Sequence, residues 1–124
     1  MNNAARGTRA ENAIVDELGS YGYDVTRSAA SKGAADLVGI HDGEVILVQV
    51  KICRPEKSYQ QPAPAERREL VRIAARCGAL PVVAQRHPGA GSRPGRTSWW
   101  QLTGAGPEDR HSWIPTGSVK EGPS

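Results

Sequence analysis

The sequence has no run of apolar residues long enough to span a membrane, and its first residues lack the apolar core of a signal peptide. We therefore expect a cytoplasmic protein with no membrane partner. Cysteine is scarce, and the spacing of Cys53 and Cys77 is not that of a metal site, so we expect two free thiols in a reducing compartment. The three histidines show no ligand spacing either. These absences argue against membrane proteins and disulfide-stapled domains.

Charge is unevenly distributed along the 124 residues. Residues 1–50 carry 4 basic and 7 acidic side chains, whereas residues 51–100 carry 10 basic and 3 acidic ones. Cations suit a phosphate backbone, and carboxylates suit a metal ion. A solvated surface with segregated charge explains the same counts equally well. The charge pattern thus permits a nucleic-acid-binding protein without establishing one.

The length allows one domain with a single core. Hydrophobic periodicity and turn residues predict an α/β fold in the order α-β-β-β-α-β-β, a mixed sheet flanked by helices. The predicted elements are a helix over 8–21, strands over 23–27, 36–40 and 45–51, a helix over 65–77, and strands over 80–85 and 97–102. We expect the first helix to begin at a capping box of Thr8 and Glu11. Beyond a domain of residues 1–102, residues 103–124 are predicted to form a loosely ordered tail.

A predicted hairpin places three polar residues on one face. Asp42 and Gly43 form a favourable two-residue turn. With that turn, Asp36 lies directly opposite Gln49. Because side chains alternate between the faces of a strand, Asp36, Gln49 and Lys51 project from the same face. The rest of the hairpin is rich in Leu, Val and Ile, so these polar groups are costly unless they bind something or one another.

Phosphodiester cleavage gives a reason for these residue types. It needs a hard cation held by oxygens, an activated water and positive charge near the phosphate. Asp36, Gln49 and the backbone carbonyl of Val50 offer oxygens. Lys51 supplies positive charge, and Glu11 is a further candidate carboxylate. Simpler explanations exist, because Glu11 is also the predicted capping residue and Asp36 and Lys51 could form only a structural ion pair.

Four segments resemble the archaeal-type Holliday junction resolvases of the PD-(D/E)XK nuclease superfamily. They are residues 7–11 (GTRAE), 22–31 (GYDVTRSAAS), 35–38 (ADLV) and 48–51 (VQVK), and the resemblance covers roughly residues 5 to 102. It implies a restriction-endonuclease-like core and a symmetric homodimer that nicks two strands of a four-way DNA junction. The implied cofactor is Mg²⁺, for which we expect Mn²⁺ to substitute.

The resemblance also implies roles for individual residues. The family's metal-binding acidic positions fall on Glu11, Asp36 and Gln49. Its catalytic lysine falls on Lys51. Its basic residue near the scissile strand falls on Arg27, and the loop serine implicated in catalysis falls on Ser31.

Two residues depart from the family pattern. Ala35 replaces a proline that shapes the backbone and ligates nothing, so this change is minor. Gln49 replaces the acidic member of the lysine motif. A neutral amide binds a divalent cation less strongly than a carboxylate does, because a full charge is missing. Gln49 therefore weakens the expectation of activity without removing it.

Basic side chains are expected to contact the DNA backbone. They are Arg9, Arg27, Lys32, Arg68, Arg72, Arg76, Arg93 and Arg96. Three of them, Arg68, Arg72 and Arg76, recur every four residues along the second predicted helix and form a stripe. A solvated face explains this stripe more simply than a ridge that contacts phosphates. Trp99 and Trp100 point to opposite faces of the last strand. We expect one in the core and the other at a dimer interface.

We predict a Mg²⁺-dependent DNA endonuclease that resolves four-way junctions in DNA recombination and repair. One alternative is another nuclease of the superfamily that acts on linear DNA in repair or restriction. A second is a catalytically inactive DNA-binding relative, which Gln49 makes plausible. A third is a basic protein-interaction domain, which leaves the alignment of Asp36 with Gln49 and Lys51 unexplained.

Overall fold

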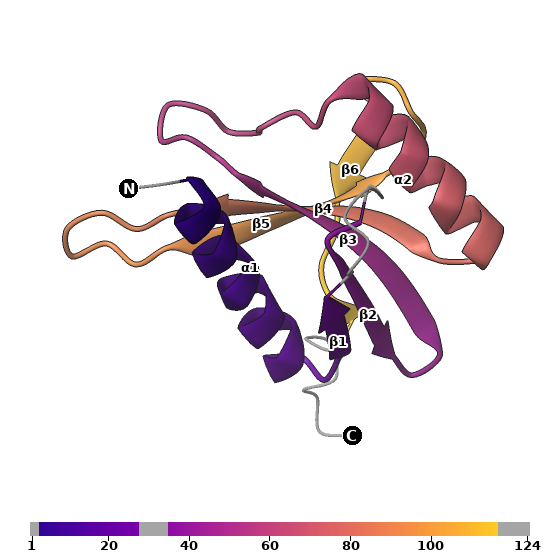
Figure 1. The fold of residues 1–124 in the computed structure, drawn as a ribbon, viewed down its shortest axis with the longest axis horizontal. Coiled ribbons are helices and arrows are strands. Elements are labelled where there is room, and N and C mark those ends of the chain that lie inside the picture. The colour runs from indigo at the N-terminus through magenta and orange to yellow at the C-terminus, as the bar shows by residue number, and fades with distance from the viewer. Residues whose placement is uncertain (1–2, 28–34, 117–124) are drawn as a thin grey trace.

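A computed structural model describes residues 3–27 and 35–116 of the chain. Two helices and six strands follow one another along the sequence (Figure 1). They are α1 (Asn3–Ser20), β1 (Asp24–Arg27), β2 (Leu37–His41), β3 (Glu44–Ile52), α2 (Pro64–Cys77), β4 (Leu80–His87), β5 (Arg96–Leu102) and β6 (Arg110–Ser112). The predicted order of elements is confirmed, with β6 added at the end.

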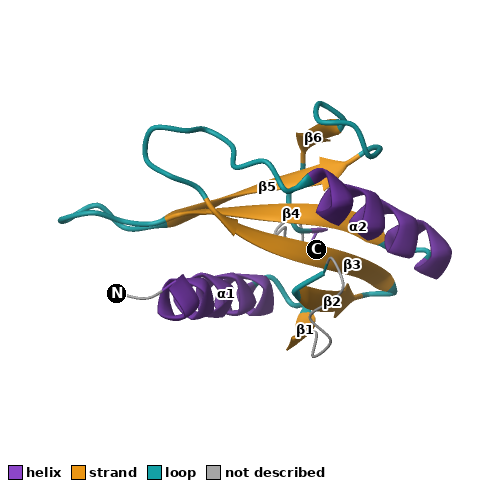
Figure 2. Ribbon diagram, turned by 45° about the horizontal axis from the view of Figure 1, so that its top comes forward, coloured by secondary structure: helices purple, strands orange, loops and turns teal. Residues whose placement is uncertain are grey.

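All six strands belong to one sheet, in the order β1-β2-β3-β4-β5-β6. The pair β3 and β4, which α2 connects, is parallel, and the other neighbours are antiparallel. The helices cover opposite faces of the sheet, as Figure 2 shows. The predicted mixed sheet flanked by helices is therefore confirmed. Neither helix in the described part of the chain is long and apolar enough to cross a membrane.

The β2–β3 hairpin has the predicted register. Asp42 and Gly43 form its turn with positive φ angles of 48° and 80°, a backbone conformation that glycine adopts at little cost. Leu37 then pairs with Val48. Alternation along β3 sends Val48 into the core beneath α1 and the neighbouring Leu47 into the core beneath α2.

The start of α1 differs from the prediction. The helix begins at Asn3, so Thr8 and Glu11 lie inside it and the expected capping box at its N-terminus is wrong. Alanine has the highest helix propensity, and the two alanines that follow Asn3 favour an earlier start. The apolar stripe of the helix is as expected, with Ile14 and Leu18 fully buried against the sheet.

The segment after Leu102 is ordered, contrary to the prediction of a loose tail. β6 pairs with β5 at the edge of the sheet. Trp113 then packs edge-on against Trp99, with 5.9 Å between the ring centroids, and Pro115 is buried. The expectation is therefore wrong for residues 103–116. Residues 117–124 lie outside the described part of the chain.

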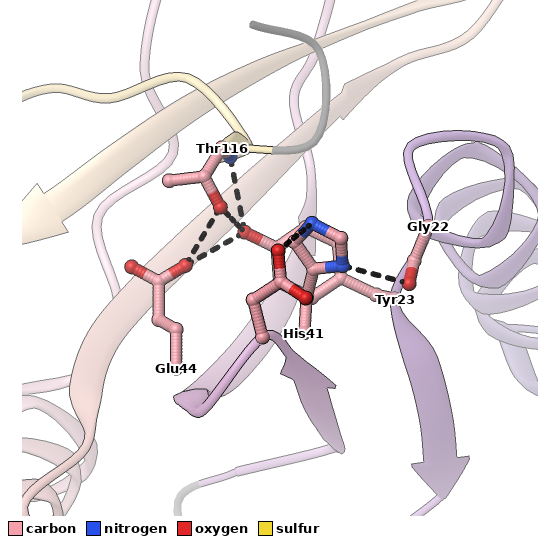
Figure 3. Close-up of polar contacts among 6 residues, drawn as sticks. Gly22, Tyr23, His41, Glu44 and Thr116 are labelled. Atoms are coloured by element: carbon pink, nitrogen blue, oxygen red, sulfur yellow. Dashed lines mark hydrogen bonds and ion pairs between the residues drawn. The ribbon is translucent and has the colours of Figure 1, made fainter. Parts of the chain in front are cut away.

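Hydrogen bonds hold the end of this segment to the β2–β3 hairpin (Figure 3). The Tyr23 hydroxyl donates to Glu44 Oε1 at 2.9 Å and accepts from the Thr116 amide at 3.1 Å. Thr116 Oγ1 also donates to Glu44 Oε1, at 3.0 Å. Burial raises the pKa of Tyr23, so its hydroxyl stays protonated and able to donate. Residues 103–116 are thus held in place by a few specific hydrogen bonds and by strand pairing at the sheet edge. The hydrophobic periodicity of the sequence does not reveal such contacts.

Candidate active site

Asp36 lies where the chain enters β2, on the side of the sheet that α2 covers. Its amide donates to the Val48 carbonyl at 2.8 Å, which extends the hairpin register by one residue. Its carboxylate Oδ2 accepts a hydrogen bond of 2.9 Å from the Val50 amide. Asp36 therefore sits across from Gln49, as the turn predicted.

The surroundings of Asp36 make ionisation of its carboxyl group unfavourable. Burial raises its pKa, and the negative charge of Glu66 adds to this effect, while the Val50 amide and Lys51 oppose it. Because the folded-state pKa lies above that of an unfolded chain, ionisation of Asp36 at neutral pH lowers the free energy of unfolding. Perturbed, half-buried carboxyl groups of this kind are frequent at functional sites.

Gln49 and Lys51 share this face, as predicted. Gln49 is 4% exposed, and its Oε1 atom has no hydrogen-bond partner in the described structure. Lys51 is only partly buried, and its Nζ lies 3.0 Å from Glu66 Oε1. The hairpin thus brings a carboxylate, an unsatisfied amide oxygen and an ammonium group together in front of the first turn of α2.

Sequence reasoning did not assign Glu66 to the site. It is the third residue of α2, where its Oε1 also accepts a hydrogen bond of 3.0 Å from the Ala63 amide. Burial would raise its pKa, but bonds from Ala63, Lys51 and Gln49 outweigh that effect and lower the pKa. The only signal in the sequence is an acidic residue in the first turn of the helix that follows the lysine strand.

Glu11 lies on α1, which packs on the other face of the sheet. Its carboxylate pairs with Arg27 Nη1 at 2.9 Å, and Arg27 also contacts the Asn12 side chain. Within residues 3–27 and 35–116, no three His, Cys, Asp or Glu side chains are grouped closely enough to hold a metal ion. The role of Glu11 as a metal ligand stays a prediction, and so does that of Arg27 toward DNA.

The basic residues predicted to contact DNA are spread over the molecule. The stripe on α2 is exposed, and within it Arg72 pairs with Glu69. Arg93 and Arg96 are exposed on the hairpin between β4 and β5, which projects beyond the sheet beside the start of α1 (Figures 1 and 2). Arg9 is exposed on α1 and lines a groove that also contains Arg86. Two candidates, Ser31 and Lys32, lie outside the described residues.

The two adjacent tryptophans do lie on opposite faces. Trp99 is in the core beneath α1. Trp100 contacts Tyr59 edge-on, with 5.5 Å between centroids, and Arg110 covers the Tyr59 ring at 3.8 Å. Trp100 therefore has neighbours within its own chain, and its expected place in a dimer interface stays a prediction.

Comparison with known proteins finds the same resemblance that the sequence motifs indicate. The family model described as archaeal Holliday junction resolvase (Hjc) matches residues 2–99. The chain is also similar to a solved structure, Archaeoglobus fulgidus Hjc, a Holliday junction resolvase from an archaeal hyperthermophile. The two are 28% identical, the match covers 74% of this chain and 70% of the other, and the TM-score is 0.60. The range matched by the family model contains Asp36, Gln49, Lys51 and Glu66.

Proposed function

The chain belongs to the archaeal Holliday junction resolvase (Hjc) family, and we propose that it cuts four-way DNA junctions by paired nicks with the help of a divalent cation. The predicted family, fold class and resolvase function are confirmed by the match over residues 2–99 and by the similar solved structure. The observation that supports the proposed chemistry is the grouping of Asp36, Gln49 and Lys51 at the open end of the β2–β3 hairpin. A DNA substrate also favours a cytoplasmic location.

The residues present fit a hard cation such as Mg²⁺ or Mn²⁺. Asp36 offers a carboxylate, and the buried Oε1 of Gln49 lacks a partner in the described structure. The Val50 carbonyl and Glu11 are further proposed ligands. Hard cations prefer such oxygen ligands. When bound, the cation supplies positive charge at the scissile phosphate and activates the attacking water.

The protein's own contribution is positioning and charge. The Val50 amide fixes the Asp36 carboxylate through Oδ2. Glu66 holds the Lys51 ammonium group on the same side of the hairpin. We propose that Lys51 orients the water or stabilises the negative charge that builds up on the phosphate.

Cleavage of a labelled four-way junction tests the proposal against its rivals. Wild-type protein should nick two symmetry-related strands in Mg²⁺ or Mn²⁺ and should do nothing in EDTA. A linear duplex of the same sequence, as the matched substrate, should be cut much more slowly. Equal cleavage of both substrates would favour a nuclease of linear DNA. Junction binding without cutting in any metal would favour an inactive DNA-binding relative.

Paired nicks require two active sites, and a chain of 13.2 kDa is too small to present both. We therefore propose a two-fold symmetric homodimer. Light scattering at micromolar concentration should give about twice the chain mass. A strictly monomeric protein, with and without junction DNA, would contradict the paired-nick mechanism.

The exposed stripe of Arg68, Arg72 and Arg76 is proposed to contact phosphates. Replacing all three by Ala should flatten the dependence of log affinity on log salt by up to about 0.9 per lost contact, because fewer counterions are released. Replacing all three by Lys keeps the charge and serves as the control. A slope unchanged by the Ala variant would identify the stripe as a solvated face.

A further inference from the structure

The proposed cation site has one negative charge fewer than the family pattern implies, because residue 49 is a glutamine. Across the hairpin from the Asp36 carboxylate stands the neutral amide of Gln49. A divalent cation held by one carboxylate and one amide keeps more of its charge uncompensated than a cation held by two carboxylates. A second carboxylate close to both side chains would remove this deficit.

Glu66 has the required position. It approaches the hairpin from the first turn of α2, where its Oε1 contacts Lys51 Nζ at 3.0 Å. The Gln49 side chain donates a hydrogen bond to the Glu66 carboxylate. Glu66 also lies close enough to Asp36 for the two carboxylates to interact electrostatically. A helix residue 30 positions from Asp36 in sequence thus belongs to the same electrostatic unit.

A second observation points to a ligand at this place. Gln49 is only 4% exposed, and its buried Oε1 atom lacks a hydrogen-bond partner among the described residues. A buried carbonyl oxygen without a partner is unfavourable. Here it belongs to an amide that lies across the hairpin from Asp36 and that hydrogen-bonds to Glu66. Two carboxylates and an amide oxygen are ligands that a hard divalent cation prefers.

We infer that Glu66 supplies a second carboxylate to the divalent-cation site on the face of the sheet that α2 covers, in the place that the amide of Gln49 leaves uncharged. The inference rests on the proposed metal-dependent cleavage. It adds Glu66 to the ligands proposed above, so that this face offers the cation three side-chain oxygens, from Asp36, Gln49 and Glu66. Lys51 then exchanges its partner Glu66 for the phosphate when cation and DNA are bound.

A purely structural role for Glu66 is the competing explanation. Its bond to the Ala63 amide caps α2, and its contact with Lys51 forms a partly exposed ion pair. Both contacts use Oε1, and a glutamine at this position would still offer an oxygen to the helix cap. Neither contact accounts for the unsatisfied Gln49 oxygen. Removing the charge of Glu66 while keeping its shape therefore separates the two explanations.

The experiment measures Mn²⁺ binding to the full chain by electron paramagnetic resonance, without DNA. Glu66→Gln should weaken Mn²⁺ binding by about tenfold or more, as Asp36→Asn should. Glu69→Gln, which removes an exposed carboxylate on the same helix, should bind Mn²⁺ like the wild type. The double variant Gln49→Glu with Glu66→Gln exchanges amide and carboxylate and should restore most of the affinity. Thermal melting confirms that each variant is folded.

The outcomes separate this inference from the proposed function. Wild-type affinity in Glu66→Gln, together with lost affinity in Asp36→Asn, would overturn the role of Glu66 and leave the nuclease proposal intact. Failure of the double variant to regain Mn²⁺ affinity would also overturn the role of Glu66. If the site needs a carboxylate at either position, moving the charge from residue 66 to residue 49 must restore binding. A wild-type protein that cuts no junction would refute the proposed function, whatever the Mn²⁺ titrations show. Unchanged Mn²⁺ affinity in both single variants would overturn the cation site to which Asp36 and Glu66 are assigned.

Discussion

Asp36→Asn is expected to reduce junction cleavage by about 10³-fold or more while leaving junction affinity unchanged or slightly higher. The substitution removes a charged metal ligand with little change in shape. The new amide oxygen can still accept the hydrogen bond from Val50 N, so the hairpin keeps its register. DNA affinity survives because it depends on arginines elsewhere, and loss of a negative charge reduces repulsion from phosphate.

Stability gives an independent check on the same variant. Because burial raises the pKa of Asp36, its ionised form destabilises the fold at neutral pH, and the neutral variant should melt at the same temperature or higher. Asp24→Asn, an exposed carboxylate on β1, is the matched control and should cut normally. Cleavage by Asp36→Asn at the wild-type rate in a single-turnover assay would contradict the proposed role of Asp36 as a metal ligand in the reaction.

Lys51→Ala should reduce the single-turnover cleavage rate by about 10²–10⁴-fold, the range typical for loss of a group that transfers a proton or stabilises transition-state charge. Lys51 is the cation that the hairpin places beside Asp36, and Glu66 holds it there. Junction affinity should again change little. The exposed Lys57→Ala is the control and should leave the rate unchanged.

Lys51→Arg then distinguishes the two roles proposed for the lysine. A guanidinium group keeps the positive charge but does not release its proton at working pH. Substantial rescue by Arg would identify charge stabilisation, whereas a rate as low as that of Lys51→Ala would identify handling of a proton. A wild-type rate for Lys51→Ala would show that this lysine has no part in the reaction.

Local chemistry is what made the hairpin predictable. The turn at Asp42 and Gly43 needs positive φ angles, and these residues adopt them readily. Once the turn is fixed, alternation along the strands leaves no freedom in which side chains face each other. The predicted alignment of Asp36 with Gln49 therefore followed from two adjacent residues and the period of a β-strand.

The errors occurred where local signals competed or were absent. Thr8 and Glu11 have the pattern of a capping box, yet favourable helix formers before them let α1 start at Asn3. The segment after Leu102 is rich in glycine, proline and charge, and its order depends on pairing of β6 with β5 and on the bonds between Tyr23 and Thr116. Such contacts join distant parts of the chain and leave no periodic trace in the sequence.

The sequence by itself determined the family, the mixed sheet and the face that carries Asp36, Gln49 and Lys51, because strand alternation and turn geometry act over a few residues. Tertiary structure alone decided which further groups meet there. The packing of α2 places Glu66 next to Lys51. On the other face of the sheet, Glu11 of α1 pairs with Arg27 of β1. Those contacts are set by how the parallel crossover from β3 to β4 and the helices pack on the sheet, a long-range outcome that no short sequence pattern encodes.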